Sequence, residues 1–160
     1  MKNSDKKKLS LWELYLTKEI GIEFKACLYF FAFLFFYCMY RVIGGVYDAS
    51  ILHMTELIFT CYIIGYIQVY LLWNFDEADA LRVKEVSGMV LCTVIYCVLS
   101  WLFNWLDRNI IATVLFGAYI LFTYFCVFLV YKYKREIDDK KLNEDLQFFQ
   151  TEQNKVHDKG

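Results

Sequence analysis

The chain has 160 residues, of which 59% are hydrophobic and 20% aromatic, and its formal net charge is −1. It contains no proline and only seven glycines, which favours long uninterrupted helices over a loop-rich fold. The apolar residues are gathered in four runs with the charges between and around them. This segregation excludes a soluble core, a disordered chain and a nucleic-acid-binding protein that relies on net positive charge, so we expect no direct binding of nucleic acid.

Residues 1–25 form a basic N-terminal segment with six lysines. Ser10 and Glu13 have the spacing of a capping box, and Leu9 and Leu14 that of the accompanying hydrophobic staple, which predicts the start of a helix. Apolar side chains then recur at helical spacing: Leu9, Trp12, Leu16 and Ile20. The segment is therefore either a short amphipathic helix on the inner leaflet or a plain extension of the apolar run that follows.

Residues 26–131 contain the four apolar runs and are predicted to be a membrane domain. A hydrocarbon core of about 30 Å needs about 20 apolar residues in a helix. The windows that meet this length are residues 26–47, 51–73, 86–106 and 110–131. The alternative, a soluble bundle, needs polar outer faces that these windows lack. We therefore predict an all-α fold, an integral membrane four-helix bundle.

The connections between the predicted spans are short on one side and longer on the other. Residues 48–50 and 107–109 are three-residue turns, so we expect two antiparallel hairpins. Residues 74–85, the inner loop, are acidic first and basic second. Fifteen of the 17 lysines and arginines fall on the side of this loop and the two termini, which predicts a multi-pass protein of the cell membrane with both termini in the cytoplasm. The first run is too long for a signal peptide and should stay as an anchor.

Residues 132–160 form a strongly charged C-terminal segment that we expect to continue from the fourth span as a cytoplasmic helix and tail. It carries a partial apolar stripe of Ile137, Leu142, Leu146 and Phe149. Such a stripe can bind another protein. The segment can equally be a solvated tail whose basic first turn maintains the orientation in the membrane.

Ionisable residues inside a span are expensive and therefore mark candidate functional sites. Arg41 in the first span and Glu56 in the second lie at matching depths, so we predict an Arg41–Glu56 ion pair. A polar pocket open to the outside would be completed by His53, Thr60, Gln68, Asn104, Asp107 and Arg108. The alternatives are that these residues join helices structurally, bind a ligand or signal, or conduct an ion or proton.

Catalytic and metal-binding motifs are missing from the sequence. The six cysteines all fall inside predicted spans and form no CxxC pair, so we expect them to act as small apolar side chains. There is no HExxH motif, Walker A loop or GxSxG elbow. We therefore expect no enzyme activity, no catalytic residue, no metal site and no cofactor.

Three short segments carry a resemblance to a known family. They are the acidic stretch 74–79 (NFDEAD), the basic exit 131–135 (YKYKR) and residues 142–146 (LNEDL). With the size and hairpin pattern, they make the chain from about Glu56 to Leu146 similar to the "domain of unknown function 3021" family of small four-span membrane proteins of Firmicutes. The first forty residues and Arg41 have no counterpart in that pattern. The family has no established catalytic residues.

Members of that family are often encoded beside LytTR-type transcription regulators, and some similar small proteins hold such a regulator inactive at the membrane. The resemblance thus implies a regulatory partner of a cytoplasmic transcription regulator. Two other functions stay open, an accessory subunit of a membrane transport or export complex and a small transporter that uses Glu56. The expected partners are the lipid bilayer and either the regulator or another membrane protein, with a second copy of the chain as a further candidate.

Overall fold

The computed structural model describes residues 11–72, 74–78 and 80–157, and within them the chain is helical and has no strand. The long helices are α1 (Leu11–Ile43), α2 (Ile51–Tyr66), α3 (Val83–Leu102) and α4 (Ile110–His157). Two short elements follow α2, the π-helical turn η1 (Ile67–Leu71) and the 3₁₀ turn η2 (Phe75–Glu77).

The structure confirms the prediction of four apolar helices of membrane-spanning length. In the described residues, the four candidate spans are Tyr15–Ile43, Ile51–Leu71, Val83–Leu102 and Ile110–Gln150. Between 22% and 33% of each apolar window is buried inside the protein, so most of its apolar side chains face outward. Helices that are apolar all round and largely uncovered belong in lipid, which indicates a multi-pass membrane protein.

The first and last spans continue as helices into the two terminal segments. This was predicted for the C-terminal segment, and at the N-terminal side the structure has the plain extension in place of a separate short amphipathic helix. α1 runs unbroken from Leu11 into the first span, and α4 continues through the basic exit to His157. The reason is local, because a change from apolar to charged side chains leaves the backbone hydrogen bonds intact and neither segment contains proline. The predicted cap and staple around Ser10 depend on residues that lie outside those described.

The turns at the ends of the spans are longer than the three residues predicted. α1 ends at Ile43 because Gly44 and Gly45 follow, and Gly45 has a φ of 74°. Helices commonly end on a left-handed glycine. Residues 44–50 therefore connect α1 to α2. Residues 103–109 likewise connect α3 to α4, with left-handed backbone at Asn104, Asp107 and Arg108.

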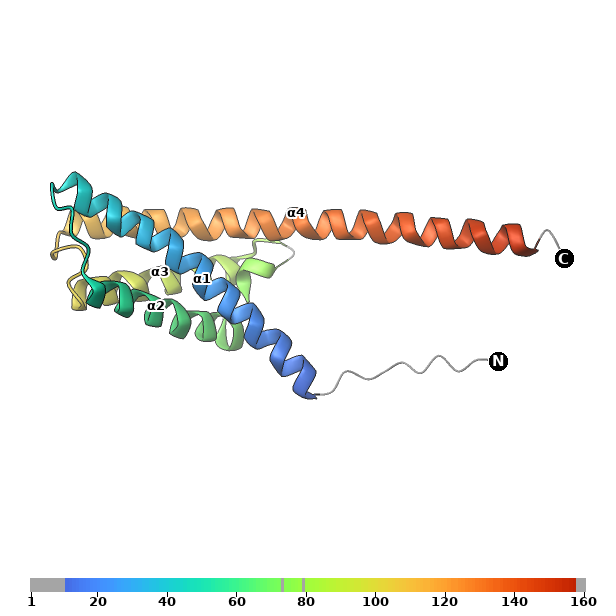
Figure 1. The fold of residues 1–160 in the computed structure, drawn as a ribbon, viewed down its shortest axis with the longest axis horizontal. Helices are drawn as coiled ribbons and strands as arrows, with labels where there is room; N and C mark the ends of the chain where they lie inside the picture. The colour runs from blue at the N-terminus through green and yellow to red at the C-terminus, as the bar shows by residue number, and fades with distance from the viewer. Residues whose placement is uncertain (1–10, 73, 79, 158–160) are drawn as a thin grey trace.

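The packing of the helices places both of these connections at one end of the molecule and both termini at the other (Figure 1). α1 packs mainly on α2, and α3 on α4. The core between them is aromatic. The Phe33 ring lies 4.8 Å from Tyr96 between centroids, and Tyr29 lies 4.9 Å from Tyr124 in an edge-to-face contact. α4 extends far beyond the other helices at the end where the chain termini lie (Figure 1).

Candidate functional site

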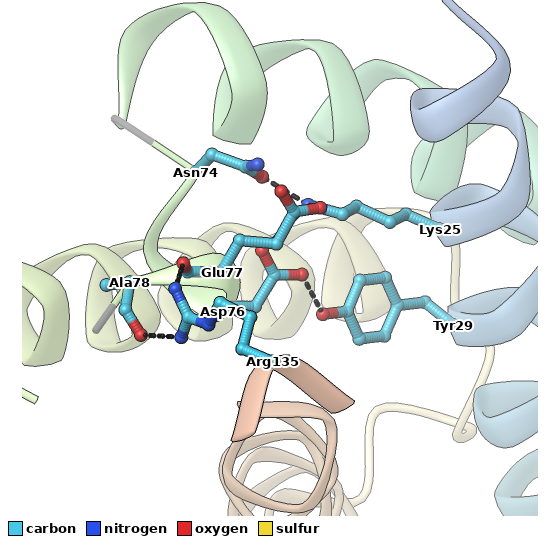
Figure 2. Close-up of polar contacts among 7 residues, drawn as sticks. All are labelled: Lys25, Tyr29, Asn74, Asp76, Glu77, Ala78 and Arg135. Atoms are coloured by element: carbon cyan, nitrogen blue, oxygen red, sulfur yellow. Dashed lines mark hydrogen bonds and ion pairs between the residues drawn. The ribbon is translucent and has the colours of Figure 1, made fainter. Parts of the chain in front are cut away.

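A buried ion cluster joins α1 to the inner loop, and we call it the Lys25 cluster. It consists of Lys25, Tyr29, Asn74, Asp76 and Glu77 (Figure 2). The Lys25 ammonium lies 2.8 Å from Asp76 Oδ1 and 2.9 Å from Glu77 Oε1, and it also donates to Asn74 Oδ1. Tyr29 donates its hydroxyl to Asp76 Oδ2 at 2.8 Å. The side chains of Lys25 and Asp76 are only 1% and 0% exposed, so the pair is sealed from solvent.

The local structure explains how these side chains meet. Lys25 and Tyr29 are four residues apart on α1 and therefore lie on the same face of the helix. Asn74 adopts a left-handed backbone with φ of 54°, which asparagine tolerates better than most residues, and starts the 3₁₀ turn that carries Asp76. Phe75 in that turn is buried against Gly88 of α3, where a Cβ atom would lie 2.8 Å from the Phe75 ring. Gly88 thus provides the space that seats the loop.

α4 contacts the inner loop at the point where this helix extends beyond the other helices. Arg135 donates from Nη1 to the carbonyl oxygen of Glu77 and from Nη2 to that of Ala78, both at 2.6 Å (Figure 2). The Lys25 ammonium also lies 5.5 Å from the centroid of the Tyr131 ring on α4, within cation–π range. The inner loop and the Lys25 cluster are therefore contacted by α1, α3 and the part of α4 around Tyr131 and Arg135.

Chemically, the Lys25 cluster acts as a cross-link. Both Asp76 oxygens and the Lys25 ammonium have partners, so the burial of the charges is compensated by hydrogen bonds. Breaking such a pair by removing one partner is costly because it leaves the other charge buried. The arrangement is suited to fixing the geometry of the loop relative to α1 and α4.

The predicted ion pair between Arg41 and Glu56 is wrong, because each of these residues has another partner. Both contacts lie at the end of the bundle opposite to the Lys25 cluster. Arg41 Nη1 lies 3.4 Å from Asp107 Oδ2, and Asp107 is 56% exposed. Glu56 Oε2 instead accepts a hydrogen bond from Trp105 Nε1 at 3.0 Å. The connection 103–109 folds over the ends of α1 and α2 and supplies both partners, which the matching of depths within one hairpin could not reveal.

The other predicted pocket residues are dispersed over the molecule. His53 Nδ1 lies 3.3 Å from the Tyr37 hydroxyl, and Thr60 is buried within α2. Gln68 lies in η1, toward the inner loop, and is buried with no hydrogen bond from its carboxamide to any described residue. Asn104 and Arg108 are exposed on the connection to α4. Of the eight residues, only His53 lines the cavity of about 10 Å³ at this end.

The predicted partner-binding residues lie on the α4 extension, which we define as residues 132–157. Their side chains are between 50% and 64% exposed: Ile137, Leu142, Leu146 and Phe149. They do not form a single stripe. At about 100° per residue, Ile137 lies about 140° around the helix from Leu142, whereas Leu146 and Phe149 share the Leu142 side.

The Lys25 cluster and Arg135 were missed as a site because their charges were interpreted only as determinants of orientation. A signal was present in the sequence, a lysine at the inner end of the first span facing a loop that begins with acidic residues. A lysine in this position predicts an acidic partner at the same depth.

Comparisons with known proteins supply no relative for this site. No protein-family profile, no curated protein and no solved structure matches the chain. The resemblance to the "domain of unknown function 3021" family therefore stays a prediction based on the three short segments.

Proposed function

We propose that this chain is a non-enzymatic, multi-pass protein of the cell membrane that binds a cytoplasmic transcription regulator of the LytTR type. The observation that carries the proposal is the α4 extension. It continues the last span as one helix beyond the other helices, and its apolar side chains are half or more exposed (Figure 1). Apolar side chains at this level lie beyond the predicted span, so contact with a protein would bury them.

The orientation required by this proposal is that of two antiparallel hairpins with both termini in the cytoplasm. Its support is the distribution of positive charge. In the sequence, fifteen lysines and arginines fall in the two terminal segments and the inner loop, whereas only Arg41 and Arg108 fall near the other ends of the predicted spans. Positive residues near span ends are retained on the cytoplasmic side.

The recognition surface would be the side of the α4 extension that carries Leu142, Leu146 and Phe149. These residues are spaced by four and three, the pattern of an amphipathic helix that lies in a groove. A few large apolar anchors of this kind dominate the affinity of most interfaces. The acidic residues between them, Glu144 and Asp145, would set the register through charge pairs at the rim.

The contacts at the base of the extension support a regulatory role over simple anchoring. Arg135 ties the start of the extension to the inner loop, and the Lys25 cluster ties that loop to α1. A change in the packing of α1 would therefore reach the α4 extension through these two sets of polar contacts, in addition to the direct contacts between α1 and α4. The transporter alternative gains no comparable support, because Glu56 is held by Trp105 near the opposite end.

The test is recovery of the tagged full-length protein from native membranes in mild detergent, with identification of the proteins that accompany it. We expect a LytTR-type regulator to be enriched with the wild type and lost after Leu142→Ala, Leu146→Ala and Phe149→Ala together. Loss of at least about tenfold in affinity is expected for three buried anchors. Ile137→Ala is the matched control because it lies on another side of the same helix.

Two results would contradict the proposal. One is equal recovery of the regulator by the triple variant and by a chain truncated after Arg135. The other is an integral membrane partner in stoichiometric amount in place of a regulator, which would favour the accessory-subunit function. Insertion of the truncated chain into the membrane should be unchanged in either case.

A further inference from the structure

An apolar groove lies between the N-terminal half of α1 and the middle of α4, outside the Lys25 cluster. The two helices diverge toward the end that carries the termini (Figure 1). They leave a space of about 600 Å³, lined in part by Gly21, Phe24, Leu28, Val127, Val130 and Lys134. Its walls come from both helices, and its surface is apolar apart from the lysine and Thr17 at one end.

The dimensions of the groove suit one acyl chain. Along α1 it reaches from Thr17 to Leu28, about 16 Å at 1.5 Å per residue. Along α4 it reaches from Cys126 to Lys134, about 12 Å on the same basis. The predicted span ends at Tyr131, so the part with Leu28 lies at the depth of hydrocarbon and the part with Lys134 at the depth of the headgroups.

The charge at the open end of the groove is positive. Lys134 is exposed there. A second, more polar cavity of about 440 Å³ shares Thr17 and Gly21 with the groove, and its lining adds both Lys18 and Glu77. Lysines just outside a span attract anionic headgroups. The groove therefore combines an apolar slot with a cationic mouth.

We propose that this groove binds one anionic phospholipid from the leaflet that faces the termini. One acyl chain fills the slot between Phe24, Leu28 and Val130, and the phosphate lies at the mouth beside Lys134. A phospholipid fits this place because the slot and the mouth have the order and spacing of a chain and its headgroup. The bound lipid would connect α1 to α4 on their lipid-facing side.

The glycine at position 21 makes the proposal testable. A Cβ atom built on Gly21 meets no atom within 4 Å, so a larger side chain can enter the groove without a clash. Leucine also favours a helix more than glycine does. Gly21→Leu should therefore fill the slot and leave the fold intact, whereas Gly21→Ala adds one methyl group and should retain the lipid.

The experiment is native mass spectrometry of the full-length protein in detergent, titrated with phosphatidylglycerol or phosphatidylcholine that carry identical acyl chains. We expect one phosphatidylglycerol to bind with a preference of about fivefold over phosphatidylcholine, the factor expected for one lysine beside an anionic headgroup. Gly21→Leu should abolish this binding. Lys134→Gln should remove the preference, and Lys132→Gln, which removes an equal charge two residues away, should keep it.

The proposal would be overturned by equal binding of the two lipids, or by a preference that persists in both Gly21→Leu and Lys134→Gln. Binding of glycerol phosphate, which has the anion without a chain, at the same strength would also overturn it by indicating a site for a soluble phosphate. The helical circular dichroism of each variant on heating confirms that a loss of lipid reflects the groove and not unfolding.

Discussion

At the scale of single residues, the ion pairs at the two ends of α1 differ most in their burial. Lys25 is paired with Asp76 in a site where neither side chain is more than 1% exposed. Arg41 is paired at 3.4 Å with Asp107, which is 56% exposed. A buried pair leaves an uncompensated charge when one partner is removed, whereas an exposed charge is solvated by water. The same kind of substitution should therefore have very different effects at the two ends of α1.

Lys25→Gln should lower the free energy of unfolding by about 3–5 kcal/mol, because the Asp76 carboxylate stays buried without its cation. Arg41→Gln, the matched control at the other end of the same helix, should lower it by about 1 kcal/mol or less. Denaturant unfolding in mixed micelles measures both. Adding Asp76→Asn to Lys25→Gln should recover part of the loss, since two amides can share hydrogen bonds without a net charge. Equal losses at Lys25 and Arg41 would show that the Lys25 cluster is not buried as described.

At the scale of elements, the inner loop is positioned by a glycine, whose lack of a side chain leaves room for a loop residue. Gly88 of α3 faces Phe75, and a Cβ atom there would lie 2.8 Å from the Phe75 ring. Phe75 is 1% exposed and lies beside Asp76 in η2, so moving its ring also displaces the carboxylate that holds Lys25. The glycine is therefore a requirement of the loop as well as of the helix packing.

Gly88→Ala should destabilise the protein by about 1–3 kcal/mol, the usual cost of overpacking a core, even though alanine favours a helix over glycine. The comparison is Gly65→Ala, where the nearest atom to the added Cβ is the Ile22 Cγ2 methyl at 3.4 Å. That variant should be close to neutral in the same unfolding measurement. A neutral Gly88→Ala would mean that Phe75 has another place to lie and that the loop is not seated by this contact.

At the scale of the whole molecule, the long α4 helix makes the proposed orientation accessible to a simple measurement. The α4 extension carries four lysines and arginines between residues 132 and 140, all at positions beyond the predicted span. With both termini in the cytoplasm, trypsin should shorten the chain at this segment in inverted membrane vesicles and leave it intact in spheroplasts. Cleavage in spheroplasts would reverse the orientation and remove the basis for a cytoplasmic partner.

The sequence by itself determined the four apolar helices and the helical C-terminal segment. These features depend on contiguous residues, namely the length of each apolar run and the absence of proline, so they can be predicted without knowing which helices touch. The same reasoning located the ends of the helices less well. Gly44 and Gly45 ended α1 several residues before the predicted turn, because backbone conformation overrode hydropathy there.

Only the tertiary structure decided which charges meet. Lys25 and Asp76 are 51 residues apart in the chain, and Arg41 and Asp107 are 66 apart. Their pairing depends on left-handed backbone at Asn74 and Asp107, which turns the two connections over the ends of the helices. Depth along a span is a one-dimensional property and predicted Glu56 as the partner of Arg41. The choice among several carboxylates at one depth depends on how the connections fold in three dimensions, since the interaction of two charges depends on the distance between them.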